Sequence, residues 1–163
     1  MRKLVIGLGI ILVIAMAMPA MAGLSYSVTG EGWYYASGTN WQEFIGFTAQ
    51  RSGKLTVSGD WSMLETRHGY GTLNGTVTGL TVTGNKAVIG GVIAQAIETP
   101  ELEGKNICWV VVDNATGRGR IIRDQISDVF IEPISYCEKR PLTLNYLQYG
   151  NIVVNSFKTV TDL

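Results

Sequence analysis

From residue 24 onward, apolar and polar side chains take turns along the chain with a period of two. Leu24, Tyr26 and Val28 alternate with small polar residues. The same pattern recurs in residues 45–50 and 55–61. Alternation of this kind buries one face of an antiparallel strand and exposes the other face to water. The sequence therefore predicts an all-β fold.

Turn residues divide the alternating runs into short strands. Residues 51–53 follow one run, and residues 84–85, Gly-Asn, interrupt another in the manner of a tight hairpin. At Gly79 the apolar residues change from odd to even positions, which predicts a bulge or a corner. The two glycines at 90–91 predict a second bend, of the kind that lets a sheet curl.

The second half of the chain combines an apolar run with longer polar segments. Residues 107–112 are continuously apolar, so we expect their strand to be covered on both faces. Residues 121–131 and 151–154 are predicted strands, whereas residues 98–105 and 132–141 are predicted loops. About eight strands spaced roughly ten residues apart predict a single antiparallel β-sandwich or flattened β-barrel.

The start of the chain has the three parts of a secretory signal peptide. Arg2 and Lys3 give a positive charge, residues 4–18 lack polar side chains, and residues 20–22 form a small-residue cleavage site before Gly23. An uncleaved membrane anchor is the rival interpretation. The apolar run is shorter than the roughly 20 residues that span a bilayer, so we favour cleavage.

We therefore expect a signal peptide at 1–22 and one domain at 23–163. The mature protein would be secreted or extracytoplasmic, in the periplasm or at the cell surface, and free of the membrane. Basic and acidic residues number 13 each. A nearly neutral chain lacks the basic surface that nucleic-acid binding requires. The oligomeric state is not indicated.

The chain has two cysteines, Cys108 in the apolar run and Cys137 in a predicted loop. Two cysteines in an exported protein most often pair, so we expect a disulfide between them. The alternative is a buried Cys108 beside an exposed Cys137. A catalytic thiol would need His68, the single histidine, as its base.

No set of residues stands out as a catalytic or metal centre. One histidine and two cysteines do not supply a common zinc ligand set, and no nucleophile-elbow motif is present. Asp124 and Asp128 could act as paired carboxylates, and Asp113, Asn114 and Asp124 could bind calcium. A solvated polar face is the favoured interpretation of the paired carboxylates, and the calcium candidates lack the spacing of an EF-hand or a nonapeptide repeat. We expect no enzyme activity, no metal and no cofactor.

Local motifs of glycines, turns and apolar strand residues follow one another between residues 28 and 154. They are Gly30-Glu31-Gly32-Trp33, residues 44–53 with Gly46-Phe47, residues 80–87, residues 112–127 with Asp113-Asn114, Gly117-Arg118-Gly119 and Asp124-Gln125, and the closing Gly150-Asn151-Ile152.

In order and spacing these motifs resemble the post-COAP family, a secreted β domain of bacterial surface and extracellular proteins. The resemblance implies an all-β fold with no assigned activity, so no catalytic residue is carried over. This chain departs from the family in residues 132–141, in its two cysteines and in standing alone behind a signal peptide.

Aromatic residues are the clearest candidates for binding. Trp33, Tyr34, Tyr35 and Trp41 lie close together in the sequence, and alternation cannot bury all of them. Exposed Trp and Tyr side chains stack on sugars or anchor protein partners. The favoured interpretation nevertheless places Trp33 and Tyr35 in the core, with Tyr34 and Trp41 at a barrel end, and binding is the alternative. The candidate ligand-binding residues are Trp33, Tyr34, Trp41 and Tyr70.

These observations favour an exported, non-catalytic structural or adhesive domain that presents loops and aromatics to a protein or glycan partner. The alternative is a small barrel that carries an apolar ligand, and the third candidate is a hydrolase. An open apolar cavity would favour the carrier, and a packed interior with Tyr34 and Trp41 outside would favour the adhesive domain. A cleft that joins His68 to two carboxylates would favour the hydrolase.

Overall fold

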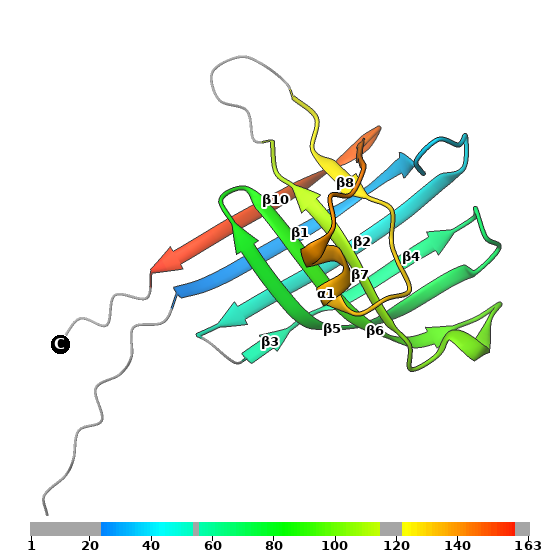
Figure 1. Cartoon of the computed structure of the whole chain (residues 1–163), viewed down its shortest axis with the longest axis horizontal. Coiled ribbons are helices and arrows are strands. Elements are labelled where there is room, and N and C mark those ends of the chain that lie inside the picture. Colours follow the sequence, from blue (N-terminus) through cyan, green and yellow to red (C-terminus); the bar gives the residue numbers. More distant parts are fainter. Residues whose placement is uncertain (1–23, 54–55, 115–121, 159–163) are drawn as a thin grey trace, which may run out of the picture.

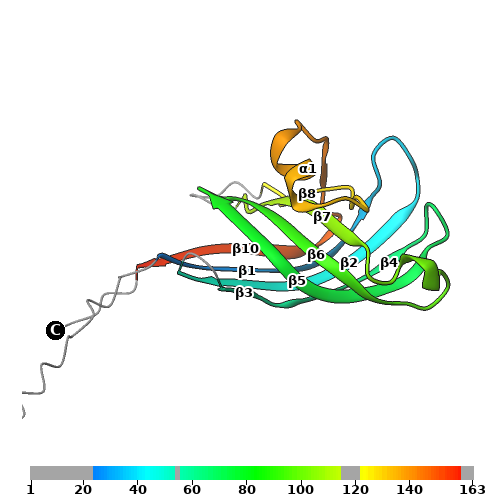
Figure 2. The same ribbon diagram turned by 60° about the horizontal axis from the view of Figure 1, so that its bottom comes forward.

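Ten antiparallel strands build one curled sheet, a half-barrel, in the computed structural model of the protein (Figures 1 and 2). The structure describes residues 24–53, 56–114 and 122–158, so the predicted signal peptide lies outside it. The all-β prediction is confirmed. The strands are β1 (Leu24–Tyr35), β2 (Gln42–Ser52), β3 (Thr56–Ser58), β4 (Asp60–Glu65), β5 (Gly71–Thr83), β6 (Lys86–Ala96), β7 (Asn106–Val112), β8 (Gln125–Ser127), β9 (Leu144–Tyr146) and β10 (Tyr149–Lys158).

The sheet follows the chain order except for β10, which lies beside β1, and β3, which lies off the main path. The strand order is β10-β1-β2-β4-β5-β6-β7-β8-β9, and the short β3 pairs with β2 outside this path. The last strand lies beside the first, from the pair Leu24 and Lys158 to the pair Trp33 and Tyr149. The predicted closing strand at 151–154 is therefore confirmed as part of β10.

The inner face of the sheet is filled with large apolar side chains. Phe47 and Trp61 both pack edge-on against Trp109, with ring centroids 5.7 and 6.2 Å apart, respectively. All three side chains are buried. Edge-to-face packing of this kind adds to the free energy gained by burying the rings.

Glycines in β5 and β6 allow side chains to pack closely against both faces of the curled sheet. The register between β5 and β6 shifts between Val77 and Gly79, which confirms the predicted bulge. Strand β6 continues through Gly90 and Gly91. A Cβ at Gly91 would lie 2.6 Å from Trp61 Nε1 inside the barrel, and one at Gly90 would lie 2.7 Å from Ile134 Cβ outside it.

Two predictions for the second half of the chain were wrong. Residues 132–141 were expected to be a loop, but Ile134–Lys139 form helix α1 against the outside of β6 and β7. A helix of six residues is too short to show a helical period in the sequence. Residues 121–131 were expected to be a strand, but within the described residues 122–131 only β8 forms, with an isolated bridge from Phe130 to Cys108.

Strand β7 is covered on both faces, as predicted. Its inward side chains join the barrel core, while Cys108 and Val110 pack outward against the helix. The expected disulfide joins Cys108 to Cys137 of α1. The predicted loop at 98–105 contains a short 3₁₀ helix, Pro100–Leu102, whose Leu102 is buried.

We expect Gly75→Ala to lower the free energy of unfolding by about 3 kcal/mol, because its Cβ would lie 1.9 Å from the backbone oxygen of Val92. Gly46→Ala is the matched control, since its Cβ would meet only Ser62 Oγ at 3.8 Å. Urea unfolding of both variants tests this. Equal midpoints would contradict the packing described for the curl.

Candidate binding site at the end of the barrel

One end of the half-barrel gathers several segments that are distant in the sequence (Figure 1). The β1–β2 hairpin and the β4–β5 loop meet the residues that follow β8 and those of β9. The β1–β2 turn is closed by a hydrogen bond of 3.0 Å from the Ala36 amide to the Trp41 carbonyl oxygen. This end of the barrel holds several hollows, two of which lie on either side of Asp128.

Asp128 connects three of these segments through one carboxylate. Its Oδ1 accepts hydrogen bonds from the Ser37 amide at 3.0 Å and from Asn145 Nδ2 at 2.9 Å. Its Oδ2 forms an ion pair with Arg67 Nη1 at 3.3 Å. Hydrogen bonds to an ionised group are stronger than neutral ones, so this side chain holds the barrel end together.

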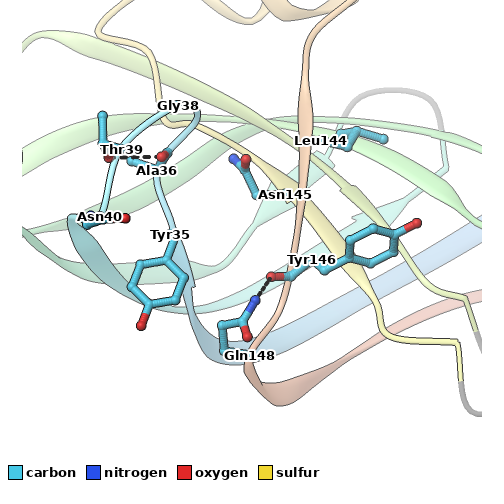
Figure 3. Close-up of a pocket in the computed structure, with 9 residues that line it drawn as sticks. All are labelled: Tyr35, Ala36, Gly38, Thr39, Asn40, Leu144, Asn145, Tyr146 and Gln148. Carbon is cyan, nitrogen blue, oxygen red and sulfur yellow. Dashed lines mark hydrogen bonds between the residues drawn. The ribbon is translucent and has the colours of Figure 1, made fainter.

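The first hollow, here called the hairpin groove, lies between the β1–β2 hairpin and β9 (Figure 3). Its volume is about 440 Å³. None of its lining residues carries a charge. They are Tyr35, Ala36, Gly38, Thr39, Asn40, Leu144, Asn145, Tyr146 and Gln148.

Carboxamide groups face this groove in fixed orientations. Asn145 donates to Asp128 and accepts a hydrogen bond from Ser37 Oγ at 3.1 Å. Gln148 donates to the Tyr146 carbonyl oxygen and accepts from Arg123 Nη1 at 3.1 Å. A carboxamide has two N–H bonds and two lone pairs, so each group keeps donor and acceptor capacity.

Figure 3 shows how the side chains around the groove are directed. Asn145 and Gln148 lie between the hairpin and β9, and the Tyr35 ring lies on the hairpin side. The Tyr146 ring points away from the hairpin. Thr39 Oγ1 donates to the Ala36 carbonyl oxygen, which helps to fix the turn that carries Asn40. The groove therefore offers the Tyr35 ring on the hairpin side, several amides, and the exposed Tyr146 ring directed away from the hairpin.

The structure corrects the interpretation of the aromatic residues. Tyr34 is fully buried, whereas Tyr35 is 40% exposed and Trp41 is 53% exposed. The favoured interpretation with Trp33 and Tyr35 in the core was wrong, because the inward phase of β1 falls on Val28 and Tyr34. Tyr34 is not presented at the surface, and its predicted ligand-binding role stays a prediction.

The other predicted ligand-binding residues lie in different places. Trp33 is half-buried and packs edge-on against Tyr35, with ring centroids 5.5 Å apart. Trp41 belongs to the same hairpin, but Tyr70 lines the second hollow. The structure thus brings Trp33 and Tyr35 together and separates Tyr70 from them. The binding roles of Trp33, Trp41 and Tyr70 stay predictions.

The second hollow, here called the end cleft, opens on the other side of Asp128 and has a volume of about 310 Å³. One part of its wall is polar and one part is apolar. The polar residues are Glu43, Glu65, Arg67, His68, Tyr70 and Asp128. The apolar residues are Met63, Leu73, Ile107, Val129, Phe130 and Ile131.

Glu65 organises the loop beside this cleft. It is buried and accepts hydrogen bonds from the amides of His68 and Tyr70, at 2.7 and 3.0 Å, respectively. His68 Nδ1 lies 2.9 Å from Glu65 Oε1. The imidazole stacks on the Tyr70 ring, with centroids 5.1 Å apart. The sequence analysis did not identify Glu65, although its odd position continues the inward phase of Trp61 and Met63.

Glu43 is the second buried carboxyl group of the end cleft. The Tyr34 hydroxyl donates a hydrogen bond to its Oε2. Burial is the largest influence on Glu43 and raises its pKa; the hydrogen bond from Tyr34 lowers it, and the charge of Glu65 raises it again. Burial, together with the charge of Glu43, also raises the pKa of Tyr34 well above its usual value.

Asp113 and Asp124, which were considered as calcium ligands, accept hydrogen bonds from backbone amides of other segments. Asp124 accepts hydrogen bonds from the amides of Asn114 and Ile152, at 2.8 and 2.7 Å, respectively. Asp113 accepts one from the Val154 amide at 3.0 Å. These carboxylates attach β10 to the segments around β7 and β8. Within the described ranges, no group of three or more His, Cys, Asp or Glu residues could hold a metal ion.

No family model, curated protein or solved structure matches this chain. The resemblance to the post-COAP family therefore stays a prediction. Of the helices in the part of the chain that the structure describes, none is long and apolar enough to cross a membrane.

The raised pKa of Glu43 predicts a pH dependence of stability. The folded protein binds this proton more tightly than the unfolded chain, so the stabilisation is complete below the unfolded pKa near 4.5 and is lost as pH rises through the folded pKa. Glu43→Gln removes this loss because the amide does not ionise. Thermal unfolding from pH 4 to 8 should show the variant gaining stability relative to the native protein as pH rises; a constant difference would contradict the assignment.

Proposed function

We propose that this protein is an exported, non-catalytic domain that binds a neutral glycan in the hairpin groove. The observation that carries this proposal is the lining of the groove, which combines the exposed Tyr35 ring with the amides of Asn145 and Gln148 and no charged side chain. The disulfide is compatible with a location outside the cytoplasm.

Sugar chemistry fits this lining. A pyranose ring has apolar C–H faces that stack on an aromatic ring, while its hydroxyl groups donate and accept hydrogen bonds in the ring plane. Tyr35 supplies the ring, and the carboxamides supply donors and acceptors that match hydroxyl groups without a net charge. An ionic ligand would find no opposite charge in this lining.

The groove is held in shape before any ligand arrives. Asp128 fixes the Ser37 amide on the hairpin and the Asn145 side chain on β9, the two sides of the groove. A site whose polar groups are already oriented loses less conformational entropy on binding. This preorganisation supports binding at the groove rather than along the outer face of the sheet.

The carrier alternative receives less support from the interior of the barrel. Phe47, Trp61 and Trp109 pack against one another there and are buried. An adhesive domain was expected to have a packed interior with Tyr34 and Trp41 exposed. The interior is packed and Trp41 is exposed, but Tyr34 is buried.

A hydrolase is the second candidate, because the end cleft joins His68 to Glu65 and is also lined by Glu43. Glu65 accepts hydrogen bonds from two loop amides, which fits a role in holding the loop. We therefore favour the binding domain. A hydrolytic activity that His68→Ala abolishes, with the fold retained, would favour the hydrolase instead.

A glycan array of neutral oligosaccharides, followed by calorimetry with the best ligand, tests the proposal. We expect Tyr35→Ala to weaken binding at least about tenfold, which corresponds to about 1.4 kcal/mol. Its effect on stability should be small because the ring is exposed. The matched control is Tyr149→Ala, an exposed tyrosine outside the groove lining.

Three outcomes would overturn the proposal. One is an array without any bound neutral glycan. Another is an equal loss of affinity in the Tyr149→Ala control, which would move the binding surface to the outer face of the sheet. The last is the capture of a protein partner whose binding is unaffected by Tyr35→Ala.

A further inference from the structure

We propose that the end cleft binds a small organic cation, a protonated primary amine attached to an apolar body. This inference does not rest on the glycan proposal, because it concerns the hollow on the other side of Asp128. It follows from the division of the cleft wall, the balance of charge in it, and the ring at its edge.

The wall of the end cleft is divided between two kinds of chemistry. Residues such as Met63, Leu73 and Ile107 belong to or border the apolar core, whereas Glu43 and Glu65 are buried acids. A ligand that fills about 310 Å³ here needs an apolar body on one side and a polar head on the other.

The charges that face the cleft leave a negative excess. Asp128 is paired with Arg67 and accepts two further hydrogen bonds. Glu65 lies beside His68, whose side chain is half exposed. Glu43 makes no ion pair among the described residues, and the charge of Arg67 lowers its pKa by less than burial raises it. Coulombic attraction between a carboxylate and a cation is stronger in a poorly hydrated site than in water, so the polar head should carry a positive charge.

Glu43 is the group best placed to meet that charge. Its carboxyl group lines the cleft, and the hydrogen bond that it accepts comes from the neutral Tyr34 hydroxyl. Burial of an acid without a positive partner favours the protonated form. An ammonium group beside Glu43 would supply the missing partner and favour the ionised form.

The stacked rings of His68 and Tyr70 add a second contact for a cation. Both residues line the cleft, and their rings are nearly parallel at an angle of 21°. A cation over the face of a tyrosine ring gains a cation–π interaction.

Binding is coupled to one proton. When Glu43 is protonated in the free protein, the incoming ammonium pairs with the carboxylate and the carboxyl proton passes to the buffer. The groups that face Glu43 from the surrounding elements are Tyr34, Glu65, Arg67, His68, Tyr70 and Asp128. We expect affinity for the amine to rise with pH until Glu43 is ionised in the free protein.

Isothermal titration calorimetry with hexylammonium, from pH 4.5 to 8 and in two buffers of different ionisation enthalpy, tests the proposal. Hexan-1-ol and hexanoate have the same apolar body without the positive charge. We expect hexylammonium to bind at least tenfold more tightly than either and to release protons at the lower pH values. Equal affinity for the alcohol, or an affinity that does not change with pH, would overturn the proposal.

Variants locate the site. Glu43→Gln should weaken hexylammonium binding at least tenfold, whereas the matched control Glu31→Gln, which removes an exposed charge on β1, should leave it within twofold. Tyr34→Phe removes the hydrogen bond that lowers the pKa of Glu43 and should move the rise in affinity to higher pH. Unchanged affinity in Glu43→Gln, or an unshifted pH profile in Tyr34→Phe, would overturn the assignment.

Discussion

The half-barrel is completed by aspartate side chains where the backbone ladder of the sheet ends. Asp113 and Asp124 accept hydrogen bonds from amides of β10, and Asp128 accepts them from the hairpin and from β9. An ionised carboxylate accepts several hydrogen bonds at once, and each is stronger than a hydrogen bond to a neutral backbone carbonyl. The two hollows at the barrel end depend on this arrangement, because Asp128 lies between them and fixes the residues around both.

Local patterns in the sequence predicted the strands and the curl because these depend on neighbouring residues. Alternation identified the long strands, and the phase change at Gly79 marked a real register shift. The continuous apolar run of β7 correctly indicated cover on both faces, which α1 and the disulfide provide. The helix itself was missed because its six residues span less than two turns.

The site was predicted less well, for two separate reasons. The alternation in the sequence did contain information about two of the site residues. The apolar residues from Leu24 to Val28 occupy even positions, and Tyr34 continues that series; the buried residues of β2 occupy odd positions, and Glu43 belongs to that series. Both side chains could therefore have been predicted to point into the barrel. Glutamate side chains are rarely buried in proteins, so the sequence alone favoured a solvent-exposed position for Glu43. The contacts of Asp128 join residues 17 to 91 positions apart, and no local period reports them.

The most direct test of this account is an NMR titration of the ¹⁵N-labelled protein with the neutral oligosaccharide that it binds best. We expect the largest shift changes in the amides of residues 35–41 and 144–148, on the two sides of the hairpin groove, together with the side-chain amide of Asn145. Changes centred on the end cleft or on the outer face of β1, β2 and β4, with the hairpin unaffected, would contradict it.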